Sequence, residues 1–88
     1  MKKWKIYYTN QANKDVKKLK KSDLKQKAKK LLDLISEDPF LKPPPYKKLT
    51  GDLLDCYSRR INIQHRLVYM VYHSQQTIKI LRMWTHYQ

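Results

Sequence analysis

Three short, strand-like runs in the last third of the chain constrain its fold more than any other feature. They cover residues 56–62, 66–72 and 77–84, and β-branched and aromatic side chains dominate them. Residues 63–65 and 73–76 connect the runs, and connections this short join neighbouring antiparallel strands. The pattern therefore predicts an antiparallel meander of three strands.

Cationic side chains interrupt the apolar pattern of these runs. In the second run Arg66 shares a face with Val68 and Met70, and in the third run Arg82 shares a face with His86. Charges cost free energy on a buried sheet face, so we expect a functional reason for them. The arrangement predicts a cationic site for a phosphodiester, with the histidine at one end.

The N-terminal part of the chain predicts a strand followed by a helix. Between Trp4 and Tyr8, β-forming residues alternate between two faces, which is typical of a strand. Thr9 is a favourable N-cap residue, because its hydroxyl can accept a hydrogen bond from the first helical turn. The helix that it starts has its apolar positions at Ala12, Val16 and Leu19.

A second helix is predicted between Ser22 and Asp38. Ser22 can cap its first amides, and Asp23 complements the positive end of the helix dipole. Pro39 disfavours helical geometry in the residue before it, which ends the helix near Glu37. Five apolar residues form one stripe along this helix: Leu24, Ala28, Leu31, Leu32 and Ile35.

A proline-rich connection, residues 39–46, separates the helices from the three strands. Its consecutive prolines, residues 43–45, should be extended and stiff. We interpret it as a spacer that carries the chain across the sheet, with a ligand for proline-recognition domains as the alternative. The only glycine, Gly51, predicts a turn soon afterwards. Residues 1–88 therefore predict a single α+β domain with two helices packed on one face of the sheet.

The charge balance points to an anionic partner. Twenty Lys and Arg residues against seven Asp and Glu residues give a formal net charge of +13. Such a surface attracts nucleic acid, an anionic membrane or an acidic protein. A solvated, lysine-rich helix face is the simplest explanation for the N-terminal lysines, and it is compatible with polyanion docking. We expect no membrane partner, because the apolar stripe of the second helix is needed for the core.

Several other kinds of site are disfavoured. Cys56 is the only cysteine, so we expect a small buried residue in a reducing cytosol and no disulfide. The longest apolar run, residues 67–72, is too short to span a membrane, and no apolar signal segment follows Lys2 and Lys3. The sequence lacks metal-ligand spacing and phosphate-binding glycine loops, so we expect neither a metal nor a cofactor.

The strand residues supply part of what RNA cleavage without a metal requires. A base must take the proton of the attacking 2′-hydroxyl, an acid must protonate the leaving 5′-oxygen, and cations must stabilise the phosphorane. Arginine offers forked donors for phosphate oxygens, and His86 can donate a proton near neutral pH. The arginines concerned are Arg59, Arg60 and Arg66, and the aromatic residues suited to base stacking are Tyr57, Trp84 and Tyr87.

Each of these residues also has an ordinary explanation. Arginines on an edge strand often prevent aggregation, and a histidine near a C-terminus is often just exposed. His65 and His73 lie in predicted turns, and we expect a structural role for His65 and assign none to His73. From spacing alone, a nuclease is no better supported than a non-catalytic nucleic-acid-binding domain.

Two motifs tie the chain to a known family. Residues 57–69 read YSRRINIQHRLVY, and residues 84–87 read WTHY. Together they closely resemble the YoeB/Txe toxins of the RelE superfamily, in their order, their separation and their distance from the C-terminus. The upstream order of one strand, two helices and a proline-containing loop is also similar to that family.

The resemblance implies a fold, an activity and partners. These bacterial, cytoplasmic toxins have a compact RelE-like α+β domain that is similar to microbial ribonucleases. They are endoribonucleases that enter the vacant A site of the 70S ribosome and cut the mRNA codon there. An acidic YefM/Axe-type antitoxin inhibits them, and homodimers are common.

The resemblance also implies roles for individual residues. Arg66 matches the transition-state arginine, His86 the general acid and Tyr87 the tyrosine beside it. Arg60 matches a further arginine that contacts phosphate. We expect four more residues to contribute to nucleic-acid binding: Arg59, Lys47, Lys48 and Tyr57.

One departure from the family concerns the general base. The family has a glutamate at the position of Lys47, and a protonated lysine cannot accept a proton. Lys47 could act in its neutral form if surrounding cations favour that form, or Asp52 or Asp55 could replace it from the same loop. The remaining alternative is a weakened or inactive RNA-binding homologue, because losing a general base costs about 10²–10⁴-fold in rate.

Overall fold

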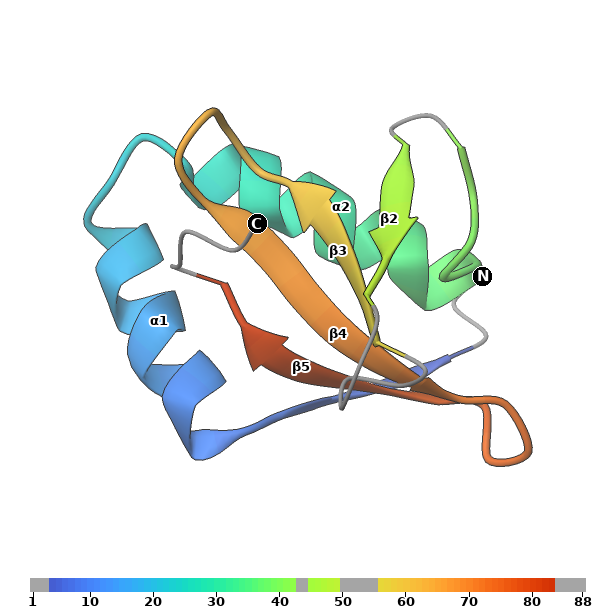
Figure 1. The fold of residues 1–88 in the computed structure, drawn as a ribbon. Helices are drawn as coiled ribbons and strands as arrows, with labels where there is room; N and C mark the ends of the chain where they lie inside the picture. The colour runs from blue at the N-terminus through green and yellow to red at the C-terminus, as the bar shows by residue number, and fades with distance from the viewer. Residues whose placement is uncertain (1–3, 43–44, 50–55, 84–88) are drawn as a thin grey trace.

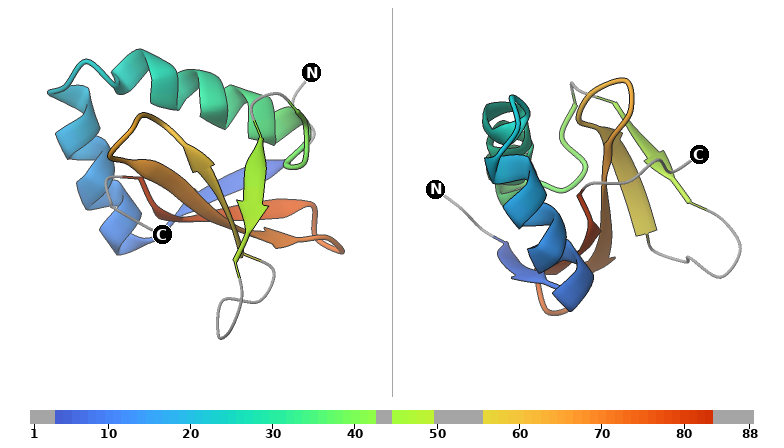
Figure 2. Two further views of the ribbon diagram at one scale, coloured as in Figure 1. Left: turned by 45° about the horizontal axis from the view of Figure 1, so that its top comes forward. Right: turned by 90° about the vertical axis from the view of Figure 1, so that its left-hand side faces the viewer.

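The structure is a computed structural model that describes residues 4–42, 45–49 and 56–83. Its strands form one sheet in the order β1-β5-β4-β3-β2. Figures 1 and 2 show both helices on the same face of this sheet, and we call the opposite face the outer face. In chain order the elements are β1 (Lys5–Tyr8), α1 (Asn10–Lys20), α2 (Lys25–Glu37), β2 (Tyr46–Lys48), β3 (Cys56–Arg60), β4 (Arg66–Tyr72) and β5 (Thr77–Arg82).

The predicted α+β class and the predicted meander are confirmed. Strands β3, β4 and β5 are consecutive antiparallel neighbours, as the short connections indicated. Two features of the sheet were not predicted. Strand β1 pairs in parallel with β5, which places Ile6 beside Ile78 and Tyr8 beside Ile80. Strand β2 is antiparallel to β3 at the other edge, in a stretch that we expected to be a connection.

Thr9 caps α1, as predicted, and also ties this helix to the sheet. Its hydroxyl accepts a hydrogen bond from the backbone N–H of Ala12 at 3.0 Å and donates one to the carbonyl of Leu81 at 3.1 Å. The backbone N–H of Thr9 donates to the carbonyl of Ile80 at 3.1 Å. The first turn of α1 is therefore fixed against the end of β5.

The start of α2 differs from the prediction. The helix begins at Lys25, and the residue before it, Leu24, makes no side-chain capping bond. The hydroxyl of Ser22 instead accepts from the backbone N–H of Leu24 at 3.1 Å and donates to the carbonyl of Leu19 at 3.0 Å. Ser22 thus stabilises the turn between the two helices, while α2 ends at Glu37 as expected.

The core lies between the helices and the sheet. Apolar residues of both helices, of β3, β4 and β5 and of the positions just after β3 and β5 form it, and the apolar stripe of α2 packs into it. The buried members of this core are Ala12, Leu19, Ala28, Leu31, Ile35, Tyr57, Ile61, Leu67, Tyr69, Val71, Ile78, Ile80 and Met83. A second, smaller cluster consists of Leu49, Cys56 and Val68, with Met70 and Leu81 packed against it. Cys56 is a small buried residue, as predicted.

Candidate nucleic-acid interface

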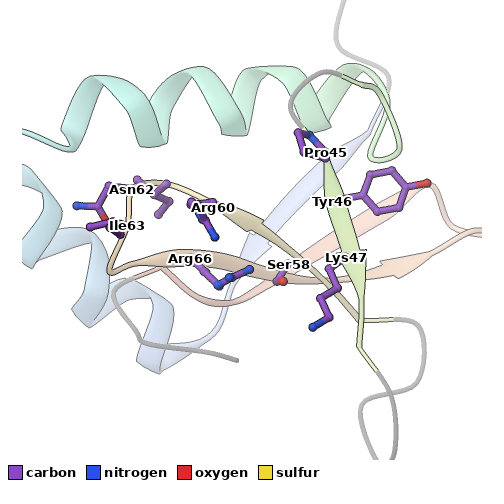
Figure 3. Close-up of a pocket in the computed structure, with 9 residues that line it drawn as sticks. Pro45, Tyr46, Lys47, Ser58, Arg60, Asn62, Ile63 and Arg66 are labelled. Carbon is purple, nitrogen blue, oxygen red and sulfur yellow. The ribbon is translucent and has the colours of Figure 1, made fainter.

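An open groove on the outer face lies between β2 and the turn that joins β3 to β4 (Figure 3). Its volume is about 650 Å³. Its described lining residues are Pro45, Tyr46, Lys47, Ser58, Arg60, Ile61, Asn62, Ile63 and Arg66. The charged members of this set are all cationic, which suits a polyanion. We call this feature the cationic groove.

Two arginines stand side by side at one end of the cationic groove. Arg60 at the end of β3 and Arg66 at the start of β4 are direct partners in the sheet register, and Figure 3 shows their side chains close together. Like charges directly opposite each other destabilise a sheet. A bound phosphate would remove this repulsion and accept hydrogen bonds from both guanidinium groups.

The turn between these two arginines is held by Asn62. Its side-chain oxygen accepts hydrogen bonds from the backbone N–H groups of Gln64 at 2.8 Å and His65 at 2.7 Å. The backbone N–H of Ile61 donates to the carbonyl of His65 at 2.9 Å. Because Asn62 binds the turn amides, β3 ends at Arg60 and not at residue 62 as predicted. His65 takes part in this turn through its backbone groups, and its structural role stays a prediction.

Lys47 lines the groove from the opposite strand, β2. Its register partner is Ser58, a buried residue on β3 that lies between Lys47 and the arginine pair in Figure 3. The next residue, Lys48, pairs with Tyr57 and is not among the groove residues. Successive strand side chains point to opposite faces, so Lys47 is on the groove side of β2 and Lys48 is not. The predicted nucleic-acid contacts of both lysines stay predictions.

Arg59 does not reach the cationic groove, and its predicted contact with nucleic acid is wrong for this geometry. The side chain is fully buried on the helix side of the sheet. Its Nε donates to the hydroxyl of Tyr69 at 3.1 Å, and its Nη2 donates to the carbonyl of Pro39 at 3.0 Å. Its guanidinium carbon lies 5.1 Å from the ring centroid of Tyr46. Arg59 therefore has a structural position inside the domain.

The hydroxyl of Tyr69 completes this buried arrangement. It donates a hydrogen bond to the carbonyl of Pro39 at 2.8 Å while it accepts from Arg59. Burial raises the pKa of Tyr69, although the neighbouring guanidinium acts in the opposite direction. A neutral phenol is thus the favoured form at this position.

Tyr57 is also on the helix side, so its predicted contact with RNA does not fit either. It is 8% exposed, and its ring lies 5.1 Å from that of Phe40 and 5.7 Å from that of Tyr46, measured between centroids. Phe40 also stacks on His73 at 5.6 Å. These aromatic residues pack together on the helix side of β2 and β3, and Tyr46 also lines the cationic groove.

Comparison with known proteins shows the family of the chain that forms this groove. Residues 8–87 match the sequence model of the YoeB-like toxin of bacterial type II toxin-antitoxin systems. The chain belongs to this family. The resemblance that the two sequence motifs indicated is thereby confirmed. No curated protein sequence matches the chain significantly.

Solved structures of YoeB toxins have the same fold. A YoeB/ParE toxin from Agrobacterium tumefaciens is 28% identical with a TM-score of 0.86, over 94% of this chain and 99% of that one. A YoeB-YefM complex from Staphylococcus aureus contains a chain 33% identical with a TM-score of 0.81, over 97% of this chain and 99% of that one. The YoeB dimer of the same species is 36% identical with a TM-score of 0.81, over 96% and 98% of the respective chains.

A buried carboxylate that sequence reasoning missed fixes the end of β5 in this YoeB-like toxin. Asp15 on α1 is fully buried, and its Oδ2 accepts from Arg82 Nε and from the backbone N–H of Met83, both at 2.9 Å. The signal was present in the sequence, because Asp15 lies between Ala12 and Leu19 on the apolar side of the helix. Arg82 therefore ties the end of β5 to α1 and lies outside the set of groove residues.

Several predicted site residues lie outside the described part of the chain. The predicted general acid His86 and its neighbour Tyr87 are among them, as are Trp84 and the alternative bases Asp52 and Asp55. Within residues 4–42, 45–49 and 56–83, no group of three or more potential metal ligands occurs. In the same residues, no helix is long and apolar enough to cross a membrane.

Proposed function

We propose that this YoeB-type toxin is an endoribonuclease that cuts mRNA in the A site of the bacterial ribosome, in the cytoplasm. The observation that carries the proposal is the Arg60–Arg66 pair, two cations held opposite each other on the outer face. Such a pair costs stability in the free protein and is suited to an anion with several oxygens. Membership of the YoeB-like toxin family supports the same conclusion.

In the proposed reaction the 2′-hydroxyl of one nucleotide attacks the adjacent phosphorus and the bond to the 5′-oxygen breaks. The 2′-proton passes to a base, and the leaving oxygen takes a proton from an acid, for which His86 is the candidate. Arg60 and Arg66 stabilise the added negative charge on the phosphorane, with Tyr87 beside the acid. Removing one such donor typically slows a reaction by about 10²–10³-fold.

Lys47 has two possible roles in this proposal. As a cation it contacts a phosphate from the wall of the groove, and as a neutral amine it takes the 2′-proton. If it acts only as a cation, Asp52 or Asp55 is left as the base, or the toxin is a weakened homologue that binds RNA and the ribosome. Substituting Lys47→Glu separates these cases. If the Lys47→Glu variant cleaves RNA much faster, the wild type is a weakened enzyme. If the wild type is already active and the variant cleaves at the same rate, Lys47 acts as the base in the wild type.

The decisive experiment maps mRNA 5′ ends on 70S ribosomes incubated with the purified toxin. We expect cuts confined to the A-site codon, and a loss of about 10²–10³-fold in cleavage rate for Arg66→Ala. Lys25→Ala is the matched control, because it removes one exposed cation from α2 on the far side of the sheet. If the toxin binds the ribosome but produces no cut mRNA ends, it is a non-catalytic binding module and not a nuclease.

We also propose an acidic antitoxin of the YefM/Axe type as the inhibitor, and a homodimer as a form of the free toxin. The YoeB of Staphylococcus aureus has been solved both in a complex with YefM and as a dimer. A chain with a net charge of +13 attracts an acidic segment that folds on binding. Co-expression with the neighbouring short acidic reading frame should relieve growth arrest, and arrest that persists would contradict this partner.

A further inference from the structure

A second cationic surface lies at the far end of the sheet's outer face. It consists of Lys5 and Tyr7 on β1, Tyr72 at the end of β4 and Lys79 on β5, around a shallow hollow of about 500 Å³. We call these residues the tyrosine–lysine platform. Figure 1 shows β1, β5 and the end of β4 running together toward the β4–β5 turn.

The sheet register brings these four side chains together on one face. Ile6 and Ile78 pack into the helix-side core, so their neighbours in sequence point to the outer face. Tyr7 pairs directly with Lys79. Thr77 pairs with Lys5 on one side and with Tyr72 on the other. The platform is therefore two adjacent rows across three strands, with a tyrosine and a lysine in each row.

The two tyrosine rings are accessible to solvent, one on the edge strand β1 and the other at the end of β4. Tyr7 is 57% exposed and Tyr72 is 36% exposed, and neither belongs to the apolar clusters of the described residues. Exposed rings that alternate with cations are the elements with which proteins bind single-stranded nucleic acid, because bases stack on the rings and phosphates meet the cations. Lysine is depleted in the cores of protein–protein interfaces, which favours a nucleic acid over a protein as the occupant.

We propose that the tyrosine–lysine platform is a second binding site for single-stranded RNA, separate from the cationic groove. Tyr7 and Tyr72 stack on bases, and Lys5 and Lys79 contact the phosphates of the same strand. The proposal rests on the proposed function for the identity of the ligand as RNA. It assigns these four residues to binding alone, because they lie away from the arginine pair.

The separation of the two sites sets a length requirement on the RNA. Arg66 begins β4 and Tyr72 ends it, and six residue steps at about 3.3 Å each place them roughly 20 Å apart. A trinucleotide can occupy one site only. An oligonucleotide of roughly 12 nucleotides, within the range of single-strand-binding folds, can occupy both. Dependence of affinity on RNA length is therefore the signature of the platform.

The test measures equilibrium binding by fluorescence anisotropy, with 2′-O-methyl RNA that has no attacking hydroxyl. We expect the double variant Tyr7→Ala/Tyr72→Ala to bind the longer RNA about tenfold or more weakly and to bind the trinucleotide like the wild type. Tyr7→Phe/Tyr72→Phe should keep wild-type affinity for both, because the stacking rings remain. Tyr8→Ala is the matched control, since Tyr8 is 39% exposed next to the platform but lines a hollow with residues of both helices.

The lysines give a second readout of the same site. The double variant Lys5→Gln/Lys79→Gln should reduce the slope of log affinity against log salt by roughly one to two for the longer RNA. A double tyrosine variant that binds the longer RNA normally overturns the proposal. The proposal is also overturned if the wild type sediments as a dimer, the double tyrosine variant sediments as a monomer, and no other property changes. The face would then be an interface between two copies of the chain. Cleavage on ribosomes is measured separately, so either proposal can fail without the other.

Discussion

Arg59 and Arg60 are consecutive residues of β3, yet they lie in opposite environments. Arg60 projects into the cationic groove opposite Arg66, whereas Arg59 is buried beneath Tyr46 with hydrogen bonds to Tyr69 and Pro39. On the helix side, the guanidinium of Arg59 donates to fixed oxygen acceptors. On the outer face, the guanidinium groups are placed where a bound anion can accept their hydrogen bonds. The comparison teaches that strand alternation places one arginine inside the domain and the next on the outer face, where we propose that it binds RNA.

The largest effect on stability is expected from removing the buried arginine. Arg59→Ala should lower the free energy of unfolding by about 4 kcal/mol, because it leaves a cavity and takes a charged donor away from two buried oxygens. Urea denaturation followed by circular dichroism measures this change. A loss below about 1 kcal/mol would break the comparison, because Arg59 would then contribute no more than an exposed residue.

The buried ion pair on the helix side should follow. Asp15→Asn should cost about 2–3 kcal/mol, because Arg82 loses its charged acceptor while an amide oxygen can still accept from Met83. Asp15→Ala should cost more, since both bonds are lost. Urea titrations of each variant measure the cost. Only a modest fall in this cost at high salt is expected, because Asp15 is fully buried while the Arg82 side chain is 34% exposed. A cost that disappears at high salt would contradict this geometry.

Tyr69 should have a smaller effect with a distinct pH dependence. Tyr69→Phe should cost about 2 kcal/mol near neutral pH, because the hydroxyl both donates to the carbonyl of Pro39 and accepts from the buried Arg59. Burial raises the pKa of Tyr69 above its usual 10.0, so the folded state holds this proton more tightly than the unfolded state. Its contribution is complete below pH 10.0 and is lost as the pH rises further. Denaturation at alkaline pH should show this fall in the wild type and less of it in the variant.

Arg60 should have the smallest effect on stability and a clear effect on binding. Arg60→Ala should change the free energy of unfolding by no more than about 0.5 kcal/mol, in the stabilising direction, because repulsion with Arg66 is relieved. RNA binding should weaken, and the slope of log affinity against log salt should fall by about one. Parallel denaturation and binding titrations test both parts. A strongly destabilised Arg60 variant would remove the contrast with Arg59.

The periodic elements could be predicted from the sequence because each has its own local signal. Alternation marks the strands, the apolar stripe marks α2, and a threonine hydroxyl marks the start of α1. Strand β2 has only the residues Tyr46–Lys48, too few for a pattern, and it forms because β3 offers an unpaired edge. The parallel pairing of β1 with β5 depends on how the whole chain packs, which no local signal contains.

The sequence shows which cationic residues lie near the site, but it does not show on which face of the sheet each of them lies. Alternation separates Arg59 from Arg60, but it does not say which of the two meets the helices. Packing decides this, because Tyr46 and Tyr57 already cover the helix side. Asp15 was missed because a carboxylate on an apolar helix face is interpreted only when its partner is known. That partner, Arg82, is 67 residues away in the sequence.

The parallel pairing of β1 with β5 also governs when the molecule can fold during its own synthesis. A growing chain presents β1 and both helices while β5 is still missing. At that stage Ile6 has no neighbouring strand, the hydroxyl of Thr9 has no Leu81 carbonyl, and Asp15 has no Arg82. Contacts this distant in sequence form late. We therefore expect unfinished chains to remain unfolded, so that the toxin becomes competent only after its own message has been read through β5.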